Sequence, residues 1–544
     1  MTTTNNNDDK EKPLRSSDDT PRHQGSSMED IKRAVDVEVP NYRDETPSRK
    51  EKFCKLPALK MMFSTRYIIA YLAFCMFTCG FMSRVTISIA MTAMVNDSAL
   101  NVELHHRDTN ASSQLCSEYN SSSSPVRQDG PFSWTIETQE LILASYFYGF
   151  LVLQVPVGYF ANRYSRASVW FFGLSLGVTG VCNVLVPVAA HAGVAWLCIN
   201  QVVPGLVEGC RYPVYYAIMA RWAPPEERSR LISIGLSGIP LGQIIGLPIA
   251  GLWTSSEEAG GWPSAFYFTG TLCIMGCIVW LSLVYDSPSS HPRISDTERD
   301  YITKSVGLEQ TQPSVTPWRS IMTSVPLLAV CIGDFAVLWI LYLFSTNLPI
   351  YLNDVLHFDI YQTGFISALP FLLYWLIMIV GGYMADFIIS RSILNRTGAR
   401  KLLTVLGFVP STICLVSVGY VGCDVTLGVA LLTLGLGTSA FCLCGTSICG
   451  FDIAPKYAGF LSAIINCFAG TTGFLVPLLI GALTTKEGNV HGWRLVFWTT
   501  AGVSMFGLIV FSIFGTAEVQ PWAQEPEGSE QNGNNRNSDE TKQA

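Results

Sequence analysis

Long apolar runs constrain this chain more than any other feature of its sequence. A helix needs roughly 20 mostly apolar residues to cross the hydrocarbon core of a bilayer. Several of the runs contain Gly and Pro, which membrane helices tolerate. The runs that meet this length are Tyr67–Val95, Glu140–Ala161, Ser168–Ala190, Val194–Ala220, Leu231–Trp253, Pro263–Tyr285, Pro326–Leu352, Tyr361–Ile388, Leu402–Val421, Val425–Cys449, Gly459–Leu483 and Leu495–Gly515. The sequence therefore predicts an all-α membrane protein with twelve transmembrane helices.

Polar residues gather outside these runs. Charged residues make up 14% of the chain, whereas a soluble domain carries about a quarter. Residues 1–64 and 517–544 are polar tails that we expect to be disordered, and the first lacks the apolar segment of a cleaved signal peptide. There is no basic domain, zinc spacing, phosphate-binding loop or nucleophile motif. We therefore expect no nucleic-acid partner, no cofactor or metal, and no enzyme activity.

Lys and Arg residues near the ends of the runs predict the orientation of the chain in the membrane. One side receives most of them: Lys50, Lys52, Lys55, Lys60, Arg66, Arg163, Arg166, Arg228, Arg230, Arg391, Arg396, Arg400, Lys401 and Lys456. The other side receives Arg107, Arg127, Lys486 and Arg494. We therefore expect both tails and the central polar loop, residues 287–323, to be cytoplasmic.

The first loop on the other side, residues 97–138, carries signs of a lumen or cell exterior. Glycosylation sequons begin at Asn96, Asn110 and Asn120, where the glycosylation machinery has access. Cys116 and Cys423 also fall on this side and are candidates for a disulfide in an oxidising compartment. Most of the other cysteines lie in the apolar runs and are interpreted as packing residues.

Short motifs recur at nearly constant spacing along the chain, as in transporters built from parallel repeats. Gly158–Asn162 and Gly382–Asp386 are offset by 224 residues (382 − 158). The pairs Ala223-Pro224 and Ala454-Pro455, and Trp262 and Trp493, are offset by 231 residues (454 − 223 and 493 − 262). The sequence therefore predicts two six-helix pseudo-repeats, residues 65–286 and 324–516.

Charged side chains inside a membrane span are costly and are functional candidates by default. Four stand out: Arg84 in the first span, Glu208 and Arg211 in the fourth, and Asp334 in the seventh. Glu208 and Arg211 are three residues apart and share a helix face. They either neutralise each other as a structural ion pair, or Glu208 has a role in transport.

The other charges leave alternatives open. Arg84 has no acidic partner within a turn or two, so it either binds an anion or pairs across helices; its planar fork suits a carboxylate. Asp334 either pairs with a cationic side chain or carries a proton or cation. Asp386 and Asp452, at cytoplasmic helix ends, and Arg163 are expected to make gating or structural contacts in the cytoplasmic loops.

Five motifs resemble those of the sialin and vesicular glutamate transporter family, which belongs to the major facilitator superfamily and also contains the type I sodium/phosphate cotransporters. They are Gly205–Gly209, Trp222–Leu231, His291–Ser295, Asp452–Gly459 and Gln520–Ala523. The resemblance runs from about Tyr67 to Ala523. It implies the major facilitator fold and the transport of small organic anions.

The resemblance also implies roles for individual residues. Arg84 falls on the arginine associated with binding the substrate carboxylate, and Glu208 on the glutamate associated with proton coupling. Gln201 stands where the family has an arginine, and Arg211 supplies a cation elsewhere on that helix; we expect both to contact substrate. Other family positions, including the motif that ends at Asp452, have changed here, at Leu143, Pro204, Val337 and Cys449–Phe451. These changes argue against a vesicular glutamate transporter.

Three functions remain open. The favoured one is a proton-coupled carrier of small organic anions that works by alternating access. The second is a sodium-coupled phosphate or organic anion cotransporter at the plasma membrane, with Asp334 serving the cation. The third is a non-transporting receptor on a carrier fold. The expected partners are a small anion, H⁺ or Na⁺, and the bilayer of a lysosome, vesicle or plasma membrane, with the chain acting as a monomer.

Overall fold

The computed structural model describes residues 64–96, 130–154, 156–157, 165–256, 258–307, 318–356, 358–421, 424–454, 457–487 and 489–523. All of them belong to one compact unit. Apart from an isolated bridge between Val95 and Phe132, the regular structure in these ranges is helical. Several predictions lie outside the described residues: glycosylation at Asn110 and Asn120, the Cys116–Cys423 disulfide and the contacts of Arg163.

The helices from α4 to α13 are called the first half below. They are α4 (Thr65–Met94), α6 (Ile136–Val152), α8 (Ser165–Ala192), α9 (Val194–Gly209), α10 (Arg211–Trp222), α11 (Pro225–Leu236), α12 (Gly238–Ser255) and α13 (Trp262–Leu283). The predicted central loop contains two further helices, α14 (Asp296–Gly307) and α15 (Trp318–Met322).

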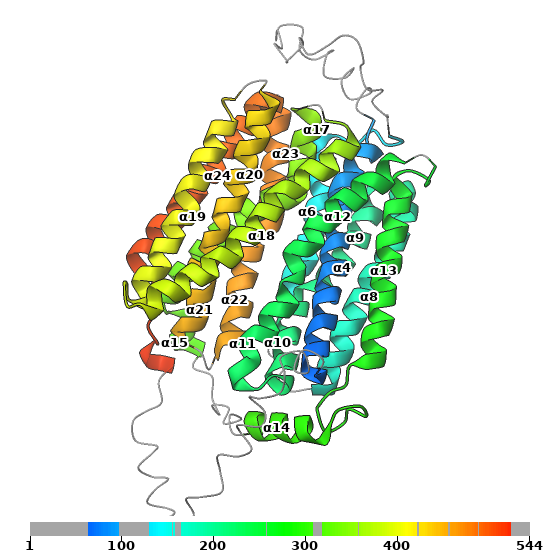
Figure 1. Ribbon diagram of the computed structural model, residues 1–544. Helices are drawn as coiled ribbons and strands as arrows, with labels where there is room; N and C mark the ends of the chain where they lie inside the picture. Colours follow the sequence, from blue (N-terminus) through cyan, green and yellow to red (C-terminus); the bar gives the residue numbers. More distant parts are fainter. Residues whose placement is uncertain are drawn as a thin grey trace, which may run out of the picture. The chain divides into compact units, whose positions relative to one another are not determined.

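The elements from α16 to α24 are called the second half. They are α16 (Val325–Tyr342), the π-helix η1 (Leu343–Asn347), α17 (Leu348–Asp354), α18 (Ile360–Ser390), α19 (Arg396–Val418), α20 (Val425–Cys442), the π-helix η2 (Leu443–Ser447), α21 (Ile448–Ile453), α22 (Ala458–Gly470), α23 (Thr472–Glu487) and α24 (Asn489–Phe514). Figure 1 shows this half, mostly yellow to red, beside the blue to green helices of the first half.

Ten helical stretches in the described ranges are long and apolar enough to cross a membrane. The second and fourth predicted spans are interrupted, the second after α6 at Leu153 and the fourth between α9 and α10, and proline explains both breaks. Pro156 has no N–H for the carbonyl of Val152, where α6 ends, and Pro213 likewise leaves the carbonyl of Gly209 without its helical bond where α9 gives way to α10.

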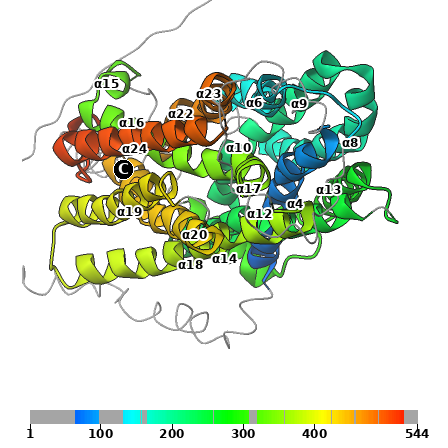
Figure 2. The ribbon, with the colours of Figure 1, turned by 90° about the horizontal axis from the view of Figure 1, so that it is seen from above.

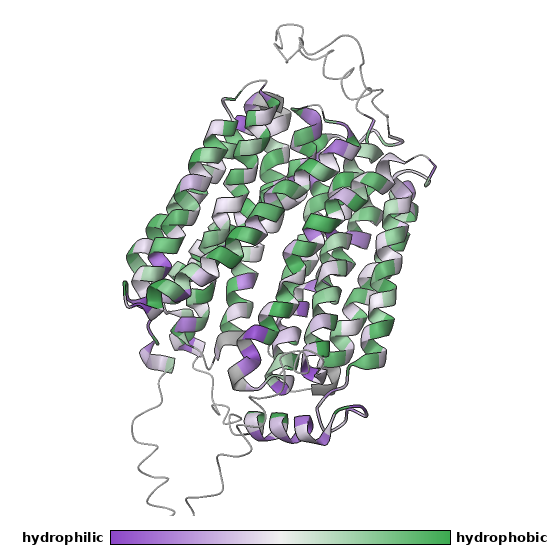
Figure 3. Cartoon of the chain, viewed as in Figure 1, coloured by the Kyte–Doolittle hydropathy of each residue, from purple (hydrophilic) through white to green (hydrophobic). Residues whose placement is uncertain are grey.

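Large apolar side chains are exposed on the outer faces of many helices. Val188, Tyr383 and Ile513 expose 64%, 75% and 64% of their surface. Figure 3 shows apolar residues along the length of the helices, with polar residues more frequent toward their ends. Monomeric soluble proteins rarely expose large contiguous apolar patches. The outer faces are therefore suited to lipid, and the chain is a multi-pass integral membrane protein.

The two halves meet along two helix pairs. The first pair is α12 and α18, and the second is α6 and α23; the views along and across the helices show both pairs side by side (Figures 1 and 2). At the first pair, a Cβ atom on Gly364 would lie 2.8 Å from the carbonyl oxygen of Leu247 and 3.1 Å from the Cα of Gly251. Glycine at position 364 therefore permits the close approach of the backbones.

The end of the chain differs from the prediction. Residues 517–523 were assigned to a disordered tail, but they pack against the second half. The N–H of Gln520 donates to the carbonyl of Ile453 at 3.0 Å, Ala517 and Ala523 are buried, and the rings of Trp522 and Tyr457 lie 6.1 Å apart. Ala517 and Ala523 belong to a buried apolar cluster that includes Ile453 of α21, and Trp522 packs against it, a contact that hydropathy averaged over a span does not detect.

Candidate functional site

A small cavity lies mainly among helices of the first half. Its volume is about 30 Å³, which is room for about two waters. The cavity is lined by Ser83, Arg84, Ile87 and Ser88 of α4, Ile142, Leu143, Tyr146 and Phe147 of α6, Thr179 and Asn183 of α8, Gln201, Pro204 and Glu208 of α9, and Thr346 of η1. It thus brings together three predicted site residues, Arg84, Gln201 and Glu208.

Arg84 lies among aromatic rings. Its guanidinium carbon is 4.7 Å from the ring centre of Phe147, 4.8 Å from that of Tyr146, 4.9 Å from that of Tyr342 and 5.4 Å from that of Phe81. Ring faces attract a cation but do not accept its hydrogen bonds as an oxygen does. The Nη2 atom of Arg84 is buried without a hydrogen-bond partner among the described residues. An unsatisfied donor of this kind is costly, and an anionic oxygen in the cavity would satisfy it.

Glu208 is bonded on both oxygens. Arg211 Nη1 donates to Oε1 at 2.6 Å, and the hydroxyl of Tyr146 donates to Oε2. The pairing expected from the three-residue spacing is therefore present, and both side chains are almost fully buried. Tyr146 contacts Arg84 with its ring and Glu208 with its hydroxyl, so it connects the two predicted functional residues.

Gly80 makes room for this ion pair. A Cβ atom at position 80 would lie 2.9 Å from Glu208 Oε1 and closer still to Arg211. Arg211 also donates from Nε to Ser175 Oγ at 3.3 Å, which ties α10 to α8. The pair is thus held between α4, α8 and the broken fourth span.

Asp334 lies away from the cavity lining. Its Oδ1 accepts hydrogen bonds from the hydroxyls of Thr446 at 2.7 Å and Ser447 at 2.8 Å, both on η2. Among the ion pairs found in the described ranges, none involves Asp334. The structure therefore does not bring Asp334 together with Arg84 and Glu208.

The predicted gating residues have different surroundings. Asp452 pairs with Arg400, Oδ2 to Nε at 3.0 Å, and Arg400 Nη1 donates to the carbonyl of Cys444 at 2.7 Å, which links α19, η2 and α21. Asp386 is exposed near the end of α18. At Asn96, the first predicted glycosylation site, the backbone N–H donates to the carbonyl of Phe132 at 2.8 Å. The roles assigned to these residues stay predictions.

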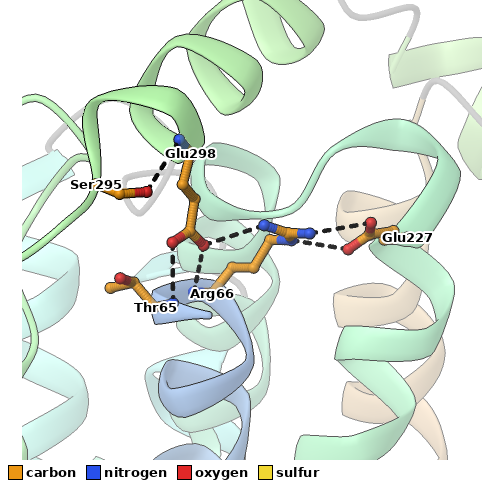
Figure 4. A network of polar contacts seen from close by, with 5 residues as sticks. All are labelled: Thr65, Arg66, Glu227, Ser295 and Glu298. Atoms are coloured by element: carbon orange, nitrogen blue, oxygen red, sulfur yellow. Dashed lines mark hydrogen bonds and ion pairs between the residues drawn. The ribbon is translucent and has the colours of Figure 1, made fainter. Parts of the chain in front are cut away.

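Sequence reasoning missed a polar network around Arg66, which it counted only as an orientation charge. Arg66 is 1% exposed and pairs with Glu227 at 2.8 Å and with Glu298 at 3.1 Å. Glu298 also accepts from the backbone N–H groups of Thr65 and Arg66, at 3.1 and 3.2 Å, and so caps α4 (Figure 4). Glu298 lies on α14, so the network joins the central loop to the first half.

A second missed residue is Glu140, which the sequence analysis places at the boundary of a span. It is 1% exposed, and Asn347 Nδ2 lies 2.6 Å from each of its carboxyl oxygens. Asn347 belongs to η1 of the second half. A signal in the sequence was available, because Glu140 directly precedes an apolar stretch and is itself flanked by no basic residue.

No cluster of three or more His, Cys, Asp or Glu side chains with the geometry of a metal site occurs among the described residues. The buried polar groups of the cavity are instead one unpaired guanidinium nitrogen, a carboxylate with its own cation, and amide and hydroxyl groups. These groups suit a polar organic ligand.

The helical fold and the buried cavity define a membrane transporter of the major facilitator type. The profile described as Major Facilitator Superfamily matches residues 72–477. The chain belongs to this superfamily and, within it, to the family of sialin and the vesicular glutamate transporters. The predictions of the fold and of a transporter rather than an enzyme are therefore confirmed.

Several curated relatives are similar along most of their length. Sialin from Homo sapiens is 37% identical over 465 residues, which cover 85% of this chain and 91% of sialin. Vesicular glutamate transporter 2 from Homo sapiens is 34% identical over 494 residues, 90% of this chain and 80% of the relative. A putative inorganic phosphate cotransporter from Drosophila melanogaster is 34% identical over 475 residues, 86% of this chain and 88% of the relative.

Solved structures support the fold. An inward-facing, unoccupied bacterial homologue of the human lysosomal transporter Spinster matches with a TM-score of 0.62 at 14% identity, covering 84% of this chain and 99% of that chain. A D-xylose–proton symporter matches with a TM-score of 0.61 at 14% identity, with the same coverage. At this identity the likeness concerns the fold alone.

Proposed function

We propose that this protein is a secondary active transporter that couples the movement of a small organic anion to protons by alternating access. The observation that carries the proposal is the buried, unpaired Nη2 of Arg84 at the cavity. The names of its relatives, sialin and the vesicular glutamate transporters, favour a carboxylate as the group that Arg84 binds. A guanidinium donates two parallel hydrogen bonds to a carboxylate, which a single point charge does not.

The other cavity residues select among anions. Gln201 offers a neutral amide where the family has a cation, so it suits a hydroxyl or amide group of the ligand better than a second negative charge. Thr179 and Asn183 add further polar groups on α8. This lining favours a monoanion with polar substituents, such as an acidic sugar, over a dicarboxylate.

The hydroxyl of Tyr146 couples the protonation of Glu208 to the binding of an anion at Arg84. In the structure its hydroxyl donates to Glu208. When Glu208 takes a proton, one of its oxygens becomes a donor, and the Tyr146 hydroxyl is released toward the cavity. The hydroxyl then adds a hydrogen bond to an anion held by Arg84, so protonation and anion binding favour each other.

A pH gradient supplies sufficient free energy for this cycle. A gradient of about two pH units gives about 2.7 kcal/mol per proton, which supports roughly a hundredfold concentration ratio. With Glu208 as the proton carrier, a monoanion crosses with one proton and no net charge, and the membrane potential of about 2.3 kcal/mol per charge per 100 mV does not act on the step.

A sodium-coupled cotransporter is the second candidate. Asp334 with the hydroxyls of Thr446 and Ser447 places three oxygens together in the second half, and oxygen ligands suit hard cations. One relative is named as a putative inorganic phosphate cotransporter. Dependence of uptake on sodium, lost in Asp334→Asn, separates this candidate from the first.

The cellular setting is part of the proposal. The Lys and Arg pattern supports cytoplasmic tails and a cytoplasmic α14. A lysosomal or vesicular membrane supplies the acidic lumen that proton coupling requires, whereas the plasma membrane suits the sodium-coupled candidate. The chain contains both halves needed for alternating access, so we propose that the monomer transports.

The test is uptake of labelled sialic acid, glutamate, aspartate, urate and phosphate into proteoliposomes under a pH or sodium gradient. We expect proton-driven uptake of one organic anion, abolished in Arg84→Ala and no longer responsive to pH in Glu208→Gln. Glu137→Gln, which removes an exposed carboxyl on α6, is the matched control. Saturable uptake that is equal in wild type and Arg84→Ala would refute the proposed site, and the absence of any uptake would leave the receptor hypothesis.

A further inference from the structure

Glu140 is a buried carboxyl that the transport scheme above does not use. It lies on the second turn of α6 with 1% of its surface exposed. The hydrogen-bond partner found for it among the described side chains is Asn347, whose Nδ2 is 2.6 Å from both carboxyl oxygens. No ion pair in the described ranges includes Glu140. This differs from Glu208, which has its own arginine.

The charged groups found around Glu140 among the described residues do not stabilise a negative charge. Asp354 of α17 acts on it electrostatically as a second carboxyl, and Glu137, one turn earlier on α6, is acidic and exposed. On α23 the neighbour is Gly481. The charged groups of α4 and α9 near α6, Arg84 and Glu208, contact Tyr146, which lies about 9 Å further along the axis of α6.

The Glu140–Asn347 contact joins the two halves. Two other contacts do the same at this π-helix: Ser88 donates to the carbonyl of Ser345 at 3.2 Å, and Gln243 donates to the Ser345 hydroxyl at 3.4 Å. Pro349 has no N–H for the Ser345 carbonyl, so this carbonyl is free to accept from the other half. Glu140 is therefore buried only while the halves are in contact at this end.

The site is built to hold a neutral carboxyl. The two N–H bonds of one amide nitrogen diverge, so Asn347 satisfies a carboxylate with a single shared hydrogen bond. Thr346 has a hydroxyl that contacts both the side-chain oxygen of Asn347 and the carbonyl of Tyr342. If it donates to Tyr342, it accepts from the Asn347 amide nitrogen, and the turned amide then presents its oxygen to a protonated Glu140.

The cost of desolvation decides whether the ionised or the protonated form of Glu140 can be buried against Asn347. An ionised carboxylate is well hydrated when the halves are apart, and burying it without a cation forfeits that hydration. A single hydrogen bond from a neutral amide does not replace the hydration shell, and Asp354 opposes a second negative charge. Protonated Glu140 loses much less on burial and keeps a hydrogen bond with the turned amide.

We propose that Glu140 is a second proton-binding residue of the transport cycle, which must take up a proton before the halves can close at η1. The proposal rests on the proton-coupled function above and deepens it. By the charge rule this end faces away from the cytoplasm, so the proton comes from the acidic compartment. Glu140 stays protonated while the contact at η1 is closed and returns its proton to the same side when the contact opens, so it controls closure without adding to the one proton per anion that Glu208 carries.

The experiment compares wild type, Glu140→Gln and the control Glu137→Gln in proteoliposomes, with the panel anion that wild type takes up fastest. Proton flux and anion flux are recorded together, with and without an imposed potential. With the pH at the η1 end varied, we expect Glu140→Gln to take up the anion with a weaker dependence on that pH than wild type and with an unchanged ratio of protons to anions, and Glu137→Gln to behave as wild type. A wild-type dependence of uptake on that pH in Glu140→Gln, or a changed ratio of protons to anions, would overturn the inference.

If Glu140→Gln shows no net uptake, anion counterflow, the exchange of labelled for unlabelled anion, is measured instead. Counterflow needs closure and reopening but no net proton transfer, and glutamine at position 140 stays neutral. We therefore expect Glu140→Gln to retain counterflow and to show a weaker dependence on pH than wild type. Loss of counterflow in a folded Glu140→Gln protein would also overturn the inference. If wild type moves no protons with any anion, the proposed function itself fails, which the same recordings show.

Discussion

The buried charged side chains of the two halves have different surroundings. In the first half, Glu208 has an arginine partner and Arg84 lies unsatisfied among four rings at the cavity. In the second half, Asp334 is held by two hydroxyls of η2 and takes no part in the cavity lining. Binding chemistry is therefore concentrated in the first half. The second half contributes Thr346 and the contacts at η1.

Under the proposed function, the first half holds the ligand and the second half covers it. Besides the two helix pairs, the second half contacts the first through the π-helix η1, and π-helices are common at functional sites. Variants at four positions, ordered from the largest expected effect to the smallest, test how completely the binding chemistry is confined to the first half.

Arg84→Ala should have the largest effect on transport, a loss of uptake of at least a hundredfold, because the variant has no cation for the carboxylate at the cavity. Arg84→Lys is the sharper comparison. Lysine keeps the charge but lacks the planar fork, so we expect uptake to fall about tenfold or more. Initial rates of labelled anion uptake measure both. Full activity in Arg84→Ala would show that the binding chemistry lies elsewhere, and the comparison between the halves would fail.

Arg211→Met should be the most destabilising of the variants. Removing one partner of a buried ion pair leaves the other charge unpaired, which typically costs about 3–5 kcal/mol. Adding Glu208→Gln should recover part of that loss, since the stranded carboxylate is then gone. Thermal unfolding of the detergent-purified proteins, followed by size-exclusion fluorescence, measures the order of stability. Equal stability of Arg211→Met and wild type would mean that the pair is not buried in the membrane.

Gly80→Ala should destabilise the first half without changing any charge. The added methyl group would overlap the Glu208–Arg211 pair, and overpacking of this kind costs about 1–3 kcal/mol. Gly382→Ala is the matched control, because no atom lies within 4 Å of a Cβ built there. Melting temperatures of the two variants give the comparison. A Gly80→Ala protein as stable as Gly382→Ala would show that the pair can shift at little cost.

Asp334→Asn should have the smallest effect if the second half only covers the ligand. An asparagine oxygen still accepts the hydroxyl hydrogen bonds of Thr446 and Ser447, so we expect uptake to change by less than about threefold and to remain independent of sodium. Uptake in sodium and choline buffers measures this. A collapse of uptake would instead favour Asp334 as a cation site and the second candidate function.

The apolar runs were sufficient to predict the class of fold, because the length and composition of a membrane helix are set by the bilayer. The Glu208–Arg211 pair was also predictable, since three-residue spacing on a helix places both side chains on one face. Long-range contacts were not. Glu140 meets Asn347 across 207 residues, and no local pattern indicates that the two helices adjoin.

The other differences between prediction and structure arise where single residues outweigh the hydropathy averaged over a span. Pro156 and Pro213 interrupt the second and fourth spans by removing single hydrogen bonds, which a hydropathy average does not register. The central loop contains α14 because Glu298 binds the start of α4, a contact between segments separated by more than 230 residues. Arg84, Gln201 and Glu208, for which the family resemblance implies roles, all line the cavity, but those roles stay predictions.

The cap on the first membrane helix constrains the order in which the protein can be assembled. Arg66 is 232 residues from Glu298 and 161 residues from Glu227. At a synthesis rate of about 5–20 residues per second, the ribosome needs on the order of ten to fifty seconds to make the intervening chain. During that time the first helix has been made but its buried arginine lacks Glu298. The first half therefore reaches its final structure only after the central loop has left the ribosome.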